Sequence, residues 1–137
     1  MDYLCRYWNA SDFAFSRLPG VLDVTLGYAG GLAEHPCHSK MGDHSEALRV
    51  TYDPQITSYE AILQVFSDIL GGPPRRRSRN KRCACLYHTP SQREAAMELV
   101  RRLCLRYDVS EVALDIEPAT EFYEAERFYQ KCFERQF

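Results

Sequence analysis

The chain of 137 residues predicts an α+β fold, a two-layer sandwich in which helices pack on one mixed β-sheet. Two patterns predict it: short β-branched runs bounded by Gly, Pro or Asp, which are typical of strands, and longer runs with apolar residues at helical spacing. Composition agrees, because 45% hydrophobic and 12% aromatic residues suffice for a packed core. We therefore expect a single domain spanning residues 1–137.

Three helices are expected, and each has a start signal. Ser11 can cap a short helix over 11–18, which Pro19-Gly20 ends. The capping box Thr-Ser-Tyr-Glu at 57–60 begins the clearest helix, and Gly71-Gly72 terminates it. A second box at 89–92, with proline at its first helical position, begins a helix that reaches about Tyr107. The tail from Phe122 is expected to be partly helical.

Five strands are expected between these helices. A first strand ends at Cys5, and others cover 21–26, 46–52, 83–87 and 111–116. The segment 32–43 and the run after Gly72 show no periodicity and are expected to be loops. The order is strand, helix, strand, strand, helix, strand, helix, strand and tail, which favours helices on one face of a mixed sheet.

Charge is distributed unevenly along the chain. The formal net charge is −2, yet the run RRRSRNKR at 75–82 holds six basic residues and no acid, so the remainder sums to −8. General nucleic-acid binding is therefore disfavoured. The run from Arg75 to Arg82 is either a solvated loop, or a nuclear-import or partner segment, and an acidic protein is the partner it would suit.

The expected location is intracellular, cytoplasmic or nuclear. The first twenty residues lack the apolar segment of a signal peptide, and no apolar run is long enough to cross a membrane. The six cysteines are therefore interpreted as free thiols or metal ligands before disulfides.

Five segments occur in an order that is specific as a set. They are LPGV at 18–21, GYAGG at 27–31, HSEALRVTYDP at 44–54, SYEAILQVF at 58–66 and FYEAERFYQ at 122–130. Together they resemble the A class of peptide methionine sulfoxide reductases, over nearly the whole chain. The resemblance implies that family's α+β fold.

The resemblance also implies a chemistry. In that family a thiolate attacks the sulfur of a methionine S-sulfoxide, and a buried glutamic acid protonates the leaving oxygen. Two tyrosine hydroxyls hold this oxygen, and a Phe-Trp pair forms the methyl pocket. A second thiol resolves the sulfenic acid as a disulfide. No cofactor is implied beyond thioredoxin or another thiol reductant, and the substrate would be methionine sulfoxide in peptides.

Carried over residue by residue, the acid is the one part of this machinery that is kept. Glu46 in the HSEA motif falls at the family's glutamate. His38 falls at the first tyrosine and Arg82 at the second, so both tyrosines are replaced. His38 can still donate a hydrogen bond as a catalytic group, while His44 and Arg82 are assigned to the substrate pocket.

The nucleophile depends on the alignment before LPGV. Without a gap, Tyr7 takes the cysteine position, and Cys5 lies two residues, or roughly 6–7 Å, from it. One inserted residue instead places Tyr7-Trp8 on the Phe-Trp pair and Cys5 near the nucleophile. The ungapped alignment keeps three anchors and the helix phase, so we favour it. Cys132 is the candidate resolving thiol.

Three hypotheses follow from the sequence. The favoured one is a degenerate reductase fold, a pseudoenzyme used for binding or protein interaction. The second is an active reductase with Cys5 as displaced nucleophile and Glu46 as acid. The third is a metal-binding module, although the spacing matches no standard zinc pattern and no metal is the expectation. Its candidate ligands are Cys37, His38, His44, Cys83 and Cys85.

Overall fold

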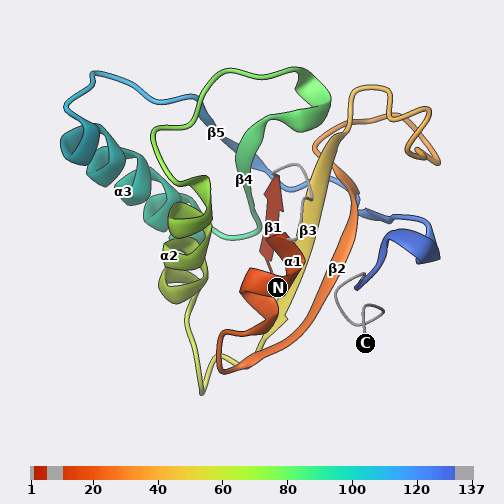
Figure 1. Ribbon diagram of the computed structural model, residues 1–137, viewed down its shortest axis with the longest axis horizontal. Helices are drawn as coiled ribbons and strands as arrows, with labels where there is room; N and C mark the ends of the chain where they lie inside the picture. Colours follow the sequence, from red (N-terminus) through yellow and green to blue (C-terminus); the bar gives the residue numbers. More distant parts are fainter. Residues whose placement is uncertain (1, 6–10, 132–137) are drawn as a thin grey trace.

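The computed structural model describes residues 2–5 and 11–131, and it has the two-layer architecture that the sequence predicts (Figure 1). The sheet has six strands in the order β5-β4-β1-β3-β2-β6. Strands β4 and β5 are parallel and all other neighbours are antiparallel, so the predicted mixed sheet is confirmed. The strands are β1 Asp2–Cys5, β2 Val21–Ala29, β3 Ser45–Tyr52, β4 Cys83–Tyr87, β5 Leu114–Pro118 and β6 Tyr123–Glu124.

All three helices lie on one side of this sheet (Figure 1). They are α1 Ser11–Ser16, α2 Tyr59–Leu70 and α3 Pro90–Tyr107. The cap of α2 differs from the expected one, because the Ser58 hydroxyl, and not that of Thr57, accepts the Ala61 amide. Gly71 ends α2 with φ 68°, as its position predicted. Within residues 2–5 and 11–131 no helix is both long enough and apolar enough to span a membrane.

Strand β2 is longer than predicted, because Gly27 does not end it. Gly27 pairs with Ala47 on one side and with Glu124 on the other. A Cβ atom at Gly27 would lie 2.3 Å from Cζ of Phe122, so the glycine allows a close approach of the chain. The described part of the tail, which was expected to be partly helical, forms β6 and one 3₁₀ turn, η2 Arg127–Tyr129.

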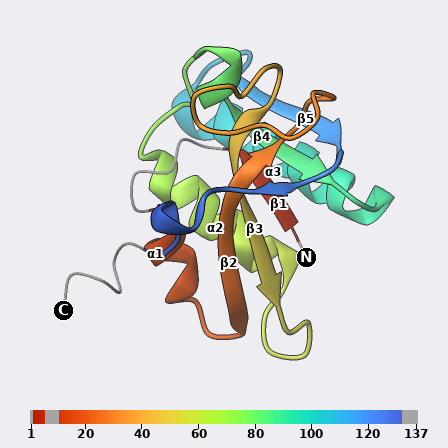
Figure 2. The ribbon, with the colours of Figure 1, turned by 90° about the vertical axis from the view of Figure 1, so that its right-hand side faces the viewer.

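The two faces of the sheet carry separate apolar clusters. The larger cluster joins the helices to one face and includes Phe15, Leu48, Phe66 and Leu99. The smaller cluster, on the other face, contains Ala29, Ala47, Ala84 and Leu86 packed against Ala119 and Phe122. Figure 2 shows the segment after β5 crossing β3 and β2 on this second face. Residues that lie opposite each other on neighbouring strands form a row across the sheet, and successive rows face opposite sides. The two clusters therefore show which side of the sheet each row faces.

The outer edge of β2 is paired by a side chain as well as by β6. The Leu26 amide donates to Oε1 of Gln130 over 2.8 Å, and Nε2 of Gln130 donates to the Leu26 carbonyl over 2.8 Å. The same Nε2 also donates to the Ala125 carbonyl over 3.1 Å. The Gln130 amide therefore extends the pairing of a strand, β6, that is only two residues long.

Candidate functional site

Six polar side chains gather where β2, β3, the 30–44 loop and η2 meet. Glu46 belongs to β3 and is buried, and Nε2 of His38 lies 3.6 Å from its Oε1. The His38 side chain is 49% exposed, so this contact reaches the surface. We call this group the Glu46 cluster. Its members are Tyr28, Cys37, His38, Glu46, Glu126 and Tyr129.

The Tyr28 phenol joins the cluster to the C-terminal segment. Tyr28 is the cross-strand partner of Glu46, and its hydroxyl donates to the Glu126 carboxylate, with both oxygens 3.1 Å away. Burial, together with the Glu126 carboxylate, raises the pKa of Tyr28, so the phenol stays protonated and donates. The ring centroids of Tyr129 and His38 lie 5.2 Å apart. Tyr28 thus adjoins Glu46 across the strands and Tyr129 adjoins His38, whereas the resemblance placed the family's two tyrosines at positions 38 and 82.

Cys37 is the thiol of the Glu46 cluster, and it lies near Glu126. Its backbone pairs with Lys40 in a tight bridge, and its Sγ lies 3.3 Å from the Ser39 hydroxyl. That hydroxyl lowers the pKa of the Cys37 thiol, while the Glu126 carboxylate opposes the shift. The loop therefore contributes a thiol and an imidazole, those of Cys37 and His38, to the cluster.

Arg82 lies apart from the Glu46 cluster. Its Nε donates to the Ser45 hydroxyl over 2.8 Å, and its Nη1 donates to Asp115 over 3.0 Å and to Glu117 over 2.8 Å. Asp115 pairs with Ala84 and Glu117 pairs with Leu86 in the parallel β4–β5 register. Ala84 and Leu86 belong to the cluster on the second face, so the two acids that bind Arg82 lie on that face as well. Glu46 belongs to the row of Tyr28, on the helix-covered face. The structure does not bring these two candidates together.

His44 is buried and holds the loop in place. Its Nε2 lies 2.7 Å from the Ala33 carbonyl oxygen. Its ring packs edge-on against the Tyr123 ring, with the two ring centroids 5.4 Å apart. The Asp43 carboxylate beside it accepts the amides of Leu32 and Ala33. These contacts shape the loop that carries His38.

The five metal-ligand candidates do not gather. Cys83 and Cys85 are buried on one face of β4, within the helix-covered core, as their alternate spacing predicts. Cys37 and His38 lie on the 30–44 loop, and His44 bonds that loop's backbone. Among the described residues, no three His, Cys, Asp or Glu side chains are grouped so that they could hold a metal ion.

Cys5 is the last residue of β1, and the register fixes its row. It lies opposite Ala47 of β3 and Ala84 of β4, which both belong to the cluster on the second face. Glu46 occupies the next row, on the other face. Tyr7, Trp8 and Cys132, the remaining candidates, lie outside the described residues.

Sequence reasoning missed Tyr28 and Glu126. Both lie within segments that carried the resemblance, GYAGG and FYEAERFYQ, so the signal was available as a motif. It did not reveal their contact, because 98 residues separate them along the chain.

Comparison with known proteins identifies the family. The model of the family described as peptide methionine sulfoxide reductase matches residues 5–137. The chain belongs to this family. It is 35% identical to peptide methionine sulfoxide reductase MsrA 1 of Rhodopirellula baltica, over 94% of this chain and 71% of that protein.

Solved structures share the fold. Reduced Mxr1 from Saccharomyces cerevisiae superposes with a TM-score of 0.80 at 16% identity, covering 98% of this chain and 84% of Mxr1. Mxr1 in complex with Trx2 gives a TM-score of 0.63 at 19% identity, covering 94% and 84% of the two chains. At this identity the likeness concerns the fold.

Proposed function

We propose that this family member is an interaction protein on the reductase fold, in which reduction of methionine sulfoxide by Cys5 is absent. The register of β1 carries the proposal. Cys5 lies in the row of Ala47 and Ala84, and Glu46 lies in the following row on the opposite face. A nucleophile and the acid that acts with it must reach the same substrate atoms, and register positions on opposite faces of the sheet argue against this pair.

The replacements at the two oxygen-binding positions also support loss of catalysis. His38, at the first of these, contacts the acid itself, at 3.6 Å from Glu46. Arg82, assigned to the second, uses its donors on Ser45, Asp115 and Glu117 on the second face. The loss of preorganised donors around a developing charge costs a few kcal/mol of transition-state stabilisation per donor.

A reduction assay with dithiothreitol tests the proposal, because a small dithiol removes the need for a resolving cysteine. The substrate is a peptide carrying methionine S-sulfoxide, and the relative from Rhodopirellula baltica serves as the positive control. The native chain, Cys5→Ser and the matched control Cys104→Ser are compared by chromatography of the reduced peptide. We expect no turnover that depends on Cys5. Turnover in the native chain that Cys5→Ser abolishes and Cys104→Ser leaves intact would overturn the proposal.

The second candidate function is sulfoxide reduction with Glu46 as acid, and the contact between buried Glu46 and His38 favours it. A thiolate would bond to the sulfoxide sulfur while Glu46 protonates the oxygen, and transfer of this oxygen to the thiol would release methionine and leave a sulfenic acid. A dithiol would then reduce the sulfenic acid, becoming a disulfide itself and releasing the oxygen as water. A thioredoxin would be the physiological dithiol, by analogy with the Mxr1–Trx2 complex. Turnover that survives Cys5→Ser but is lost in Glu46→Gln would select this candidate, with another thiol as nucleophile.

A further inference from the structure

The start of β4 carries two adjoining cavities lined by arginine. The first, of about 240 Å³, lies between the C-terminal end of α2 and the loop that follows it, with Leu70, Pro73 and Pro74 in its wall. The second, of about 250 Å³, extends from there toward β5. Both cavities share Arg75, Arg77 and Cys83, so they form one continuous depression. We call it the arginine groove.

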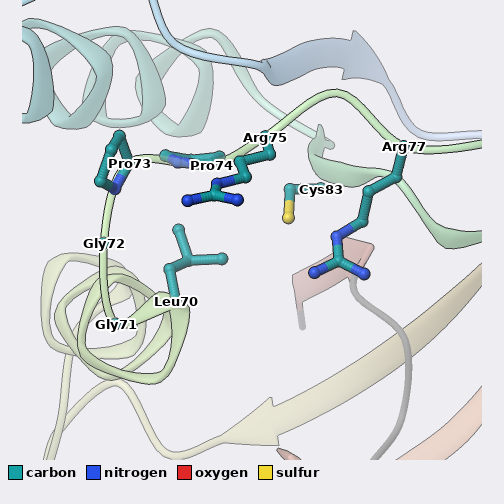
Figure 3. A pocket seen from close by; sticks show the side chains of 8 residues that line it. All are labelled: Leu70, Gly71, Gly72, Pro73, Pro74, Arg75, Arg77 and Cys83. Atoms are coloured by element: carbon teal, nitrogen blue, oxygen red, sulfur yellow. The ribbon is translucent and has the colours of Figure 1, made fainter.

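The groove has an apolar part and a cationic part. Figure 3 shows the guanidinium group of Arg75 beside Leu70, with the Cys83 thiol between Arg75 and Arg77 in this view. Arg76 lines the second cavity with them. These three arginines are exposed, whereas Cys83 at the floor is buried. The cations are thus presented at the rim of the groove.

The basic run divides into structural and unneutralised members. Arg79 donates to the Asp43 and Gly30 carbonyls, and Arg82 is held by Asp115 and Glu117. No acid of the described chain lies within ion-pair distance of Arg75 or Arg76. Arg75 and Arg76 therefore offer charge that the acids of the described structure do not balance.

Size and charge indicate the kind of ligand. Each of the two cavities is smaller than roughly 300 Å³, the lower end for small-molecule sites, so each part of the groove suits one side chain of a longer ligand. Guanidinium groups bind carboxylates in a forked geometry, and an apolar wall next to them suits an aliphatic side chain. A long phosphate backbone is disfavoured, because Asp115 lines the same groove and the chain outside the run sums to −8.

We propose that the arginine groove binds an acidic segment of a partner protein. Carboxylates of this segment pair with Arg75, Arg76 and Arg77, and an apolar side chain of the same segment packs against Leu70 and Pro73. The interaction lies at the start of β4 and involves none of the residues in the Glu46 cluster. It is therefore independent of whether sulfoxide is reduced.

Fluorescence anisotropy tests the groove with a labelled peptide that alternates leucine with aspartate and glutamate. The loop variant is Arg75→Ala, Arg76→Ala and Arg77→Ala together. The matched control is Arg93→Ala, Arg101→Ala and Arg102→Ala, which removes the same charge from exposed positions of α3. We expect the native chain to bind the peptide at low salt, the loop variant to bind about tenfold more weakly or worse, and the control to bind as the native chain does.

Two further probes complete the experiment. A peptide with asparagine and glutamine in place of the acids is expected not to bind, and added salt is expected to weaken the acidic peptide. The proposal is overturned if the native chain does not bind the acidic peptide, or if both triple variants lose affinity equally. It is also overturned if an oligothymidylate binds at this loop more tightly than the peptide does, since the groove would then be a nucleic-acid site.

Discussion

Replacing Arg82 with methionine tests whether this arginine is a structural cation or a ligand-binding group. Methionine keeps an unbranched side chain of similar length but removes all donors. The variant leaves Ser45, Asp115 and Glu117 without the guanidinium group that each contacts within 3.0 Å. The variant thus loses the ion pairs that join the residue before β4 to Asp115 and Glu117 of β5.

The magnitude follows from the exposure of the partners. The Arg82 side chain is 6% exposed, whereas Asp115 and Glu117 are 49% and 36% exposed. Hydrogen bonds to charged groups contribute about 1.5–3 kcal/mol each, and water can rehydrate the two acids in the variant. We therefore expect a loss of about 2–3 kcal/mol in the free energy of unfolding. For a domain of this size the melting temperature should fall by roughly 8–10 °C.

Urea unfolding followed by circular dichroism measures this loss, with an unchanged denaturant slope as evidence that the compact state is preserved. Arg101→Met is the matched control, because Arg101 pairs with Glu98 on the exposed surface of α3, and its unfolding midpoint should not move. Arg82→Lys should lie between the native chain and the methionine variant, since a lysine lacks the forked donors. A loss below about 1 kcal/mol for Arg82→Met would refute the structural role and make Arg82 available to a ligand.

Two further predictions concern the segments around the Glu46 cluster. Gly27→Ala places a methyl group 2.4 Å from the Tyr123 carbonyl oxygen, so we expect β6 to detach from β2. Faster exchange of the Tyr123 and Glu124 amide hydrogens would show this detachment, and unchanged exchange would contradict it. The Leu32 and Ala33 amides lower the pKa of Asp43 in the folded state. The Asp43 carboxylate therefore stabilises the fold above its unfolded pKa of about 3.9, and this stabilisation is lost as the pH falls through the folded pKa. Asp43→Asn should therefore flatten the decline of the urea midpoint below about pH 4, and a decline as steep as that of the native chain would disprove the assignment.

The fold was predictable from the sequence because its signals are local. The strand at 83–87 and the helix from Pro90 to Tyr107 have the predicted bounds. A short apolar run and a capping threonine both act on the few residues next to them, so each can be recognised from the local sequence. Gly27 misled the prediction for a physical reason. A glycine serves equally to end a strand and to let another segment approach a continuing one, and only the position of Phe122 decides between them.

The candidate site was predictable only in part, since its contacts join distant segments. The resemblance assigned Glu46 and His38 to one site, and in the structure Nε2 of His38 lies 3.6 Å from Oε1 of Glu46. The pairing of Tyr28 with Glu126 and that of Arg82 with Asp115 require the order of strands in the sheet, which no local pattern specifies. The row of Cys5 likewise depends on how β1 pairs with β3, because a slip of one residue reverses every face.

The amide of Gln130 has a consequence for the behaviour of the protein at high concentration. A sheet edge with unpaired amides and carbonyls is a template on which another chain can add a strand, and this is a common route to aggregation. Beyond the short β6, the Gln130 side chain occupies both backbone groups of Leu26, and Lys131 pairs with Asp23 further along β2 at 3.0 Å. The C-terminal segment thereby protects the molecule against edge-to-edge association, whatever chemistry its face supports.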